Sequence, residues 1–420
     1  MKDESKFHPS SFILYPSPFA MISFSQAQRN ERLNAVDILV ATPFIVLITQ
    51  YAPVLVTRLG ASSLLLGLLT SGSALVVTLG AIFGPAWLRR VPDYRISYGL
   101  PGLIWRFVCF VIPLALILPN YQAEVIVFAT IGLSLFSGFA NFAFTAYLPR
   151  MTLPDRVGKL VSLRWTMLGL GMCITTPLLA ALLDAFSQPT NYWVVSILSF
   201  ILVMASWVAL LMTKPAPAPS KVTQRQNISF AQLRAYKPAW HYILISLLIH
   251  SAINAGGPLI TLQMVRVLNA SNADFGWYLA IFWAALALFG LITPRLIQRW
   301  GNAKIFGASA IGLAAQLIIL AIAPNLAITW VAGFIAGVAS VMFQVSSYAL
   351  LVDCAPENMY EGYVSWHTTT INIAIFAAPL IMSAFIDAGL SIGLALFICA
   401  AFRALAGVVA LRTVKPAINR

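Results

Sequence analysis

Four polar residues within otherwise apolar stretches are the positions best suited to binding a small ligand. His250 and Asn254 lie four residues apart, so they share one face of a helix. Asn141 and Gln344 each stand alone among apolar neighbours. A carboxamide donates and accepts hydrogen bonds, which suits a polar neutral molecule such as a sugar, a polyol or an amino-acid backbone. The alternative is that the two amides hydrogen-bond to neighbouring helices.

His250 is also the candidate for a proton-responsive group near the centre of an apolar stretch. Imidazole has an unperturbed pKa of about 6.5, whereas a guanidinium group stays charged. The acidic residues lie close to the expected ends of the apolar stretches. The alternative is a neutral His250 that only forms hydrogen bonds, and the sequence leaves both roles open.

No pattern for enzymatic chemistry accompanies these residues. The sequence holds no Walker loop, dinucleotide-binding glycine motif, His-Glu-x-x-His motif or nucleophile elbow. The four cysteines are widely separated and favour structural thiols over a metal site: Cys109, Cys173, Cys354 and Cys399. We expect no enzyme activity, no metal and no cofactor.

The composition excludes water as the main solvent of the chain. Of 420 residues, 60% are hydrophobic and 9% are charged, whereas about a quarter of the residues in a soluble domain are charged. The net charge of +13 is spread over short tracts between long apolar runs. It therefore indicates membrane topology, and we expect a lipid bilayer and no nucleic acid as partner.

Twelve apolar stretches are long enough to cross a hydrocarbon core of about 30 Å as helices. Lipid offers the backbone no hydrogen-bond partner, and these runs are too continuous for the strands of a barrel. The predicted fold is an all-α integral membrane protein with twelve transmembrane helices, at residues 34–56, 63–86, 96–118, 123–148, 160–183, 191–213, 240–265, 273–297, 304–323, 326–352, 363–387 and 390–412.

Basic residues indicate the orientation of these spans. With a cytoplasmic N-terminus, all but four of the 26 Lys and Arg lie on or near the cytoplasmic side. Arg58 and Arg266 lie outside, and Arg106 and Arg403 lie within spans. This asymmetry predicts a multi-pass protein of the cell inner (plasma) membrane with both termini cytoplasmic. A charge inside a span is costly, so we expect Arg106 and Arg403 to turn inward to carbonyls or a hydrated cleft.

The second half of the chain repeats the first. A polar linker separates six spans from six, and residues such as Arg58, Pro85 and Asp184 find counterparts at a nearly constant offset. The counterparts are Arg266, Pro294 and Asp387. We therefore predict an N-terminal cytoplasmic tail, an N-terminal six-helix half, a cytoplasmic linker, a pseudo-symmetric C-terminal half and a cytoplasmic C-terminal tail, at residues 1–33, 34–213, 214–239, 240–412 and 413–420.

The six-plus-six layout, the central linker and the basic loops after spans 2 and 8 resemble the major facilitator superfamily over residues 33–412. Residues 84–90 (GPAWLRR) keep only part of the family's loop signature, so no branch of the family is indicated. The resemblance implies two halves that rock about a solute site lined by spans 1, 4, 7 and 10. It implies a secondary active transporter or facilitator for a small-molecule substrate, working as a monomer and without ATP hydrolysis.

A transporter-like fold can also serve as a membrane receptor or scaffold, and this is the alternative function. A receptor would be expected to carry a large soluble signalling domain or a long folded loop. The sequence between residues 34 and 412 shows neither.

Charged residues near the ends of spans predict three structural ion pairs. Spans 1 and 5 each carry one charge near the inner end and one at the outer end, and the repeat supplies an outer pair in the second half. At exposed ends such a pair contributes about 0 to 1 kcal/mol, so the pairs serve as packing predictions. They are Asp37 with Arg164, Arg58 with Asp184, and Arg266 with Asp387.

Overall fold

The computed structural model of the protein describes residues 22–153, 156–216, 229–355 and 360–413, and within these ranges every regular element is a helix. Twelve helical segments are long and apolar enough to cross a membrane. The predicted all-α fold with twelve spans is therefore confirmed. Large parts of the expected tails and of the linker, at residues 1–21, 217–228 and 414–420, lie outside the described structure.

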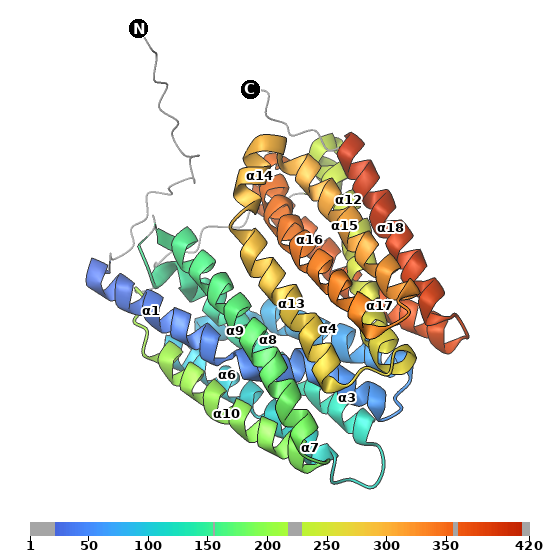
Figure 1. The fold of residues 1–420 in the computed structure, drawn as a ribbon. Helices are drawn as coiled ribbons and strands as arrows, with labels where there is room; N and C mark the ends of the chain where they lie inside the picture. The colour runs from blue at the N-terminus through green and yellow to red at the C-terminus, as the bar shows by residue number, and fades with distance from the viewer. Residues whose placement is uncertain (1–21, 154–155, 217–228, 356–359, 414–420) are drawn as a thin grey trace.

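The N-terminal half contains the first six spans (Figure 1). Its first span is a long helix interrupted by a π-helical turn, and its third span is divided into three short helices. In chain order the elements are α1 (Phe24–Val40), α2 (Thr42–Val46), η1 (Leu47–Tyr51), α3 (Ala52–Arg58), α4 (Ser63–Arg90), α5 (Tyr94–Ser97), α6 (Gly99–Arg106), α7 (Val108–Ala115), α8 (Gln122–Tyr147), η2 (Leu148–Arg150), α9 (Val157–Ala185) and α10 (Thr190–Leu211).

The C-terminal half contains the other six spans and lies beside the first (Figure 1). A short helix precedes its first span, and a second short helix follows the span formed by α13. The elements are α11 (Phe230–Ala235), α12 (Lys237–Leu262), η4 (Gln263–Val267), α13 (Asn272–Gly290), α14 (Thr293–Trp300), α15 (Asn302–Ile322), α16 (Leu326–Asp353), α17 (Tyr360–Asp387) and α18 (Ile392–Thr413).

The first helix begins earlier than the sequence analysis predicts. It starts at Phe24, so residues 24–33 are helical and not part of a tail. Two of their polar side chains face protein: Asn30 and Glu31 are buried, and Glu31 forms an ion pair with Arg156 at 2.5 Å. Consequently Asp37 lies well inside the first helix and not close to its start.

The third span is interrupted at a proline and again before its last third. Pro101 has no N–H with which to bond the carbonyl of Ser97. The indole N–H of Trp87 donates to that carbonyl instead, at 2.9 Å. A second break at Phe107 separates α6 from α7. Arg106, the last residue of α6, is buried in the bundle at this break.

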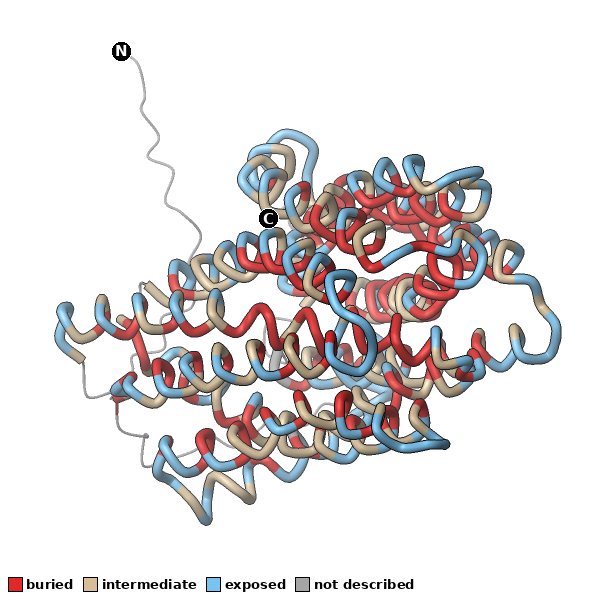
Figure 2. Tube along the Cα trace, turned by 60° about the horizontal axis from the view of Figure 1, so that its bottom comes forward, coloured by how far each residue is buried: buried red, intermediate tan, exposed pale blue. Residues whose placement is uncertain are grey.

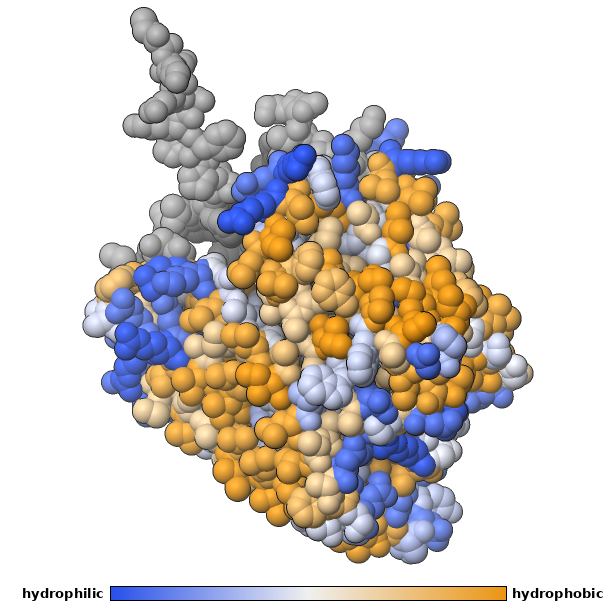
Figure 3. All heavy atoms as spheres, in the orientation of Figure 1, coloured by the Kyte–Doolittle hydropathy of each residue, from blue (hydrophilic) through white to orange (hydrophobic). Residues whose placement is uncertain are grey.

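Apolar side chains cover much of the outer surface, whereas many polar ones are inside. Exposed Leu, Ile, Val and Phe residues occur on spans of both halves, and the face shown in Figure 3 is largely hydrophobic between its charged edges. Buried segments run through the middle of both bundles (Figure 2). Small polar residues such as Thr176, Ser206 and Ser346 are fully buried. This arrangement suits lipid as solvent, because polar groups then find partners only within the bundle.

Glycines allow α4 and α8 to cross at backbone contact. A Cβ atom on Gly80 would lie 2.7 Å from the carbonyl oxygen of Leu135, and one on Gly138 would lie 3.0 Å from the Cα of Gly80 and closer still to the carbonyl of Val77. Such close approach of small residues is a common basis of helix association in membranes.

Replacement of Gly138 by alanine should lower the midpoint of thermal unfolding in detergent. The new methyl group would push α8 away from α4, and overpacking costs about 1–3 kcal/mol. Gly132 on the same helix is the matched control, because a Cβ there meets nothing within 4 Å. Gly132→Ala should leave stability unchanged or raise it by up to about 1 kcal/mol. Equal effects of both changes would refute tight packing at Gly138.

Candidate functional site

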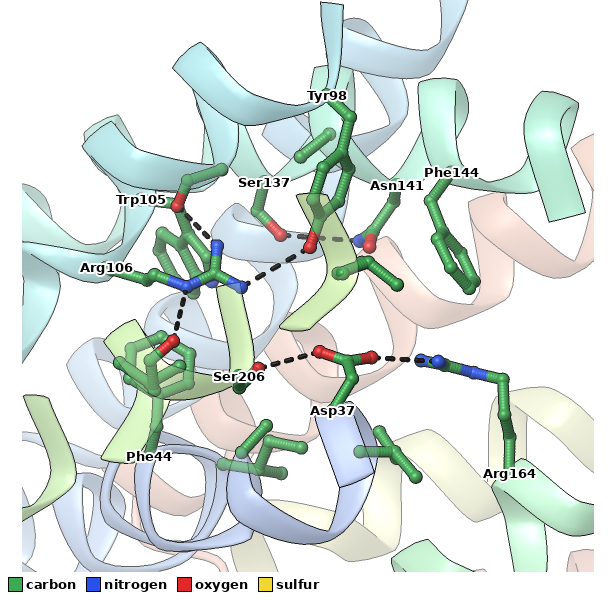
Figure 4. A pocket seen from close by; sticks show the side chains of 17 residues that line it. Asp37, Phe44, Tyr98, Trp105, Arg106, Ser137, Asn141, Phe144, Arg164 and Ser206 are labelled. Atoms are coloured by element: carbon green, nitrogen blue, oxygen red, sulfur yellow. Dashed lines mark hydrogen bonds and ion pairs between the residues drawn. The ribbon is translucent and has the colours of Figure 1, made fainter. Parts of the chain in front are cut away.

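A cavity of about 150 Å³ lies within the N-terminal half, between elements of the first, third, fourth, fifth and sixth spans (Figure 4). Its wall combines aromatic rings with polar and charged groups. Asn141 is exposed, so the cavity reaches the surface of the half at this residue. The polar side chains of the wall are Asp37, Tyr98, Arg106, Ser137, Asn141, Arg164 and Ser206.

The structure brings Asp37 and Arg164 together as an ion pair in this wall. The Nη1 of Arg164 lies 2.8 Å from the Oδ2 of Asp37, and the side chains are 16% and 6% exposed, respectively. Ser206 donates to the other carboxylate oxygen at 2.7 Å. Arg164 also donates to the Oδ1 of Asn34 at 2.8 Å and lies over the ring of Phe144. The pair joins α1, α9 and α10.

Arg106 turns into the bundle, as predicted, and borders the same cavity. Its Nε donates to the carbonyl of Val203 on α10 at 3.0 Å. Its Nη1 donates to the carbonyl of Gly102 at 2.7 Å, and its Nη2 to the hydroxyl of Tyr98 at 3.3 Å. The residue is 7% exposed. Among the residues that the structure describes, no carboxylate forms an ion pair with it.

Of the four predicted binding residues, Asn141 alone lines the described cavity. Its amide donates to the Oγ of Ser137 at 3.3 Å. Gln344, which lies on α16 in the second half, is exposed. His250 and Asn254 lie on α12 in the other half, where Asn254 donates to the carbonyl of His250 at 2.7 Å. The structure thus places the four residues on both halves and not in one pocket.

The environment of His250 indicates its tautomer. Its Nδ1 lies 2.8 Å from the carbonyl oxygen of Ser246. A carbonyl oxygen can only accept, so we assign the proton to Nδ1. In the neutral ring, Nε2 is then an acceptor. The ring lies 5.3 Å from that of Phe343, between their centres, and the residue is half-buried.

The model of the Major Facilitator Superfamily matches residues 35–262 and 243–419. The chain belongs to this superfamily. No curated protein matches it in sequence. Among solved structures it is similar to a point variant of the nucleoside transporter NupG, with a TM-score of 0.69 and 12% identity, over 93% of this chain and 100% of the other.

Two further solved structures resemble this superfamily member in fold. A D-xylose-proton symporter has a TM-score of 0.69 and 14% identity, over 95% of this chain and 100% of the other. A bacterial homologue of the human lysosomal transporter Spinster, inward-facing and occupied, has a TM-score of 0.65 and 14% identity, over 94% of this chain and 95% of the other. At such low identity the likeness concerns the fold.

The prediction of two outer ion pairs is wrong, because the charged groups do not contact each other directly. Neither Arg58 and Asp184 nor Arg266 and Asp387 form an ion pair; the pairs present among the described residues are those of Glu31 and Asp37. Each of the four side chains instead binds the opposite half of the protein. We call these contacts the distal networks, since they lie at the end formed by the loops at residues 59–62, 186–189, 268–271 and 388–391.

The first distal network connects the first and fifth spans to the start of α13. Arg58 donates to the Oδ1 of Asn272 at 2.7 Å and to the carbonyl of Ala270 at 2.8 Å. Asp184 accepts from the side-chain amide of Asn272 at 2.6 Å and from the backbone N–H of Ala273 at 3.0 Å. Asn272 therefore stands between the two charges that were predicted to pair.

The second distal network repeats this arrangement with the halves exchanged. Arg266 donates to the carbonyl of Ala61 and to the Oγ of Ser63. Asp387 accepts from the backbone N–H groups of Ser63 and Leu64 at 2.9 and 2.8 Å. The first N–H groups of a helix lack partners within it and carry partial positive charge, which explains why each carboxylate binds a helix start.

Two kinds of site residue escaped the sequence analysis. Tyr98 and Ser206 contribute to the cavity, but a hydroxyl in a span gives no sign of its direction in the sequence. Asn272 lies at a helix start, where Asn commonly acts as a cap. Arg106 did carry a signal, because an ionisable residue within a span is by default a candidate functional residue.

The Asp37–Arg164 pair should behave as a coupled unit in unfolding experiments. Asp37→Asn alone leaves the mostly buried Arg164 without its partner, and breaking a buried pair costs about 3 kcal/mol or more. Adding Arg164→Gln should recover part of this loss, since the unpaired charge is then gone. Thermal unfolding of both single variants and the double variant measures the coupling. Additive losses would show that the pair contributes nothing specific.

Proposed function

We propose that this protein is a secondary transporter or facilitator that moves a small solute across the membrane by alternating access, without ATP hydrolysis. The main support for this proposal is the location of the hydrogen bonds between the two halves. Over the described parts of the chain, every hydrogen bond between the two halves belongs to the distal networks. The hydrogen bonds between the halves thus lie at one end, although α9 packs on α13 and α4 on α17 as well.

The charge distribution supports an outward orientation of this linked end. We propose that both termini are cytoplasmic and that the protein lies in the inner (plasma) membrane, because basic residues gather at the end opposite the distal networks. The structure then corresponds to a state closed to the outside. In an outward-open state both distal networks would be broken.

Candidate solute contacts come from both halves. We propose that Asn141 and Gln344 offer carboxamides from α8 and α16, and that His250 and Asn254 offer polar groups from α12. The Nε2 of His250 is suited to accept a hydrogen bond from a solute. His250 is also the proposed group for coupling to protons, since imidazole can bind a second proton at Nε2.

Single cysteines test the orientation. In a background without Cys109, Cys173, Cys354 and Cys399, cysteine at Ser187 or Asn325 should react with an impermeant thiol reagent on intact cells. Cysteine at Gln298 should react only after the membrane is opened. All three positions are exposed, so the burial of the side chain does not explain a difference. The reverse labelling pattern would overturn the proposed topology.

Loss of the distal carboxylates should favour opening at the outer end. In the double variant Asp184→Asn, Asp387→Asn, an amide replaces each carboxylate at a helix start of the opposite half. Spin labels at Asn120 and Asn325, on distal loops of the two halves, should then show a larger population of long distances in double electron–electron resonance.

Asp274→Asn is the matched control for this experiment. Asp274 lies at the same end, but its carboxylate accepts from Ser271 within its own helix start and forms no bond to the other half. The control should keep the distance distribution of the parent. An unchanged distribution in the double variant would contradict the proposed closing role of the distal networks.

His250→Gln tests the coupling role in proteoliposomes. With a transported solute, an imposed inward pH gradient should accelerate uptake by the parent protein. The variant should keep exchange without a gradient but lose this acceleration, because glutamine can hydrogen-bond but cannot take up a proton. Gradient-driven accumulation by the variant would exclude His250 as the coupling residue.

A further inference from the structure

Arg106 contributes a buried positive charge that no side chain in the cavity neutralises. Of the three charged residues in the wall, Asp37 is the acid, and Arg106 and Arg164 are the cations. Both oxygens of Asp37 are already bound, one by Arg164 and one by Ser206. The wall therefore carries one net positive charge, and it belongs to a residue that is 7% exposed.

Several hydrogen-bond donors around this cavity have no protein acceptor. A guanidinium group has five N–H bonds, and the described structure supplies Arg106 with three acceptors. Two N–H bonds are left. The hydroxyl oxygen of Tyr98 accepts from Arg106, so its own proton remains available to donate. Figure 4 shows Arg106 and Tyr98 on one side of the cavity and Asn141 with Ser137 beside them.

Arg403 is the buried arginine of the last span, in the second half. It is 2% exposed, and its guanidinium donates to the carbonyls of Ala252, Ile253 and Leu313 and to the side chain of Gln316. These acceptors lie on α12 and α15, so Arg403 holds two neighbouring helices to α18. Arg403 therefore provides a structural comparison for Arg106.

We propose that the cavity binds a small organic monocarboxylate, whose carboxylate lies against Arg106 and Tyr98. This assignment rests on the proposed transport function and adds the class of solute. A single negative charge would neutralise the wall. A carboxylate accepts from several donors at once, and its hydrogen bonds to a guanidinium are short and strong.

The size and the lining of the cavity limit the organic group that carries this carboxylate. A protein cavity of about 150 Å³ can hold a molecule as large as benzene, so the part of the solute beyond its carboxylate should be no larger than a benzene ring. The rings of Phe44 and Trp105, 5.9 Å apart between centres, form an apolar part of the wall. A compact aromatic or branched carboxylate therefore fits better than a long chain or a sugar acid.

Benzoate, benzamide and benzylamine are matched probes, because they differ in charge far more than in shape. Binding to the purified full-length protein in detergent is measured by isothermal titration calorimetry. Benzoate should bind at least tenfold more tightly than benzamide, and benzylamine should not bind detectably, since a second cation would meet the unmatched charge. Equal affinity for benzoate and benzamide, or no binding of benzoate, overturns the proposal.

Variants assign the charge effect to Arg106. Arg106→Gln should remove the preference for benzoate over benzamide, and Arg106→Lys should retain part of it. Arg403→Gln lowers stability through lost helix contacts but should keep the full preference. If Arg106→Gln does not fold, the affinities of the three probes for the parent protein and for Arg106→Lys still test whether Arg106 causes the preference for benzoate. A preference that survives in folded Arg106→Gln overturns the assignment.

Counterflow of labelled benzoate in proteoliposomes separates this inference from the proposed function. If benzoate binding depends on Arg106 but no benzoate flux is observed, the anion site is supported and transport is contradicted. If neutral solutes are transported equally well by Arg106→Gln and benzoate does not bind, transport is supported and the anion site is contradicted. Flux of benzoate that is lost in Arg106→Gln and kept in Arg403→Gln supports both.

Discussion

A membrane-spanning bundle must satisfy its charged groups from within, because lipid supplies neither hydrogen bonds nor counter-ions. This constraint governs the interior of both halves. Asp37 and Arg164 satisfy each other across the first and fifth spans. Arg403 is satisfied by carbonyls of two neighbouring helices. Arg106 has three protein acceptors and borders a cavity, and the anion that we propose would accept from its remaining N–H groups.

Equivalent buried positions of the two halves carry different side chains. In the first half, the Asp37–Arg164 ion pair lies toward the end opposite the distal networks. The corresponding positions of the second half hold Ser246 and His367, both buried. There the ring of His367 stacks on that of Tyr242, with 5.2 Å between their centres. At these equivalent positions, an ion pair in the first half thus corresponds to a hydroxyl and an imidazole in the second.

Helix packing and hydrogen bonds both contribute to the contacts between the halves. Within a half, glycines bring helices to backbone contact over long stretches, as at Gly80 and Gly138. Between the halves, glycines also allow close packing, since a Cβ on Gly276 would lie 2.8 Å from the Cβ of Ala180. In addition, carboxylates bind the starts of opposing helices in the distal networks. Interactions of a carboxylate with a helix start contribute about 0.3–1 kcal/mol at exposed sites. Such contacts are weak enough to break and reform, which the transport cycle that we propose requires.

The sequence by itself determined the twelve spans, the repeat of the two halves and the family, because the length of apolar runs and the spacing of charges are properties of the chain. It also predicted that Arg106 and Arg403 turn inward, since a lipid-facing charge is too costly. Only the tertiary structure decided the partners. It showed that α1 begins at Phe24 and that Asn272 stands between Arg58 and Asp184. The choice among polar partners depends on distances between segments far apart in sequence, and these distances are set by packing across helices and halves.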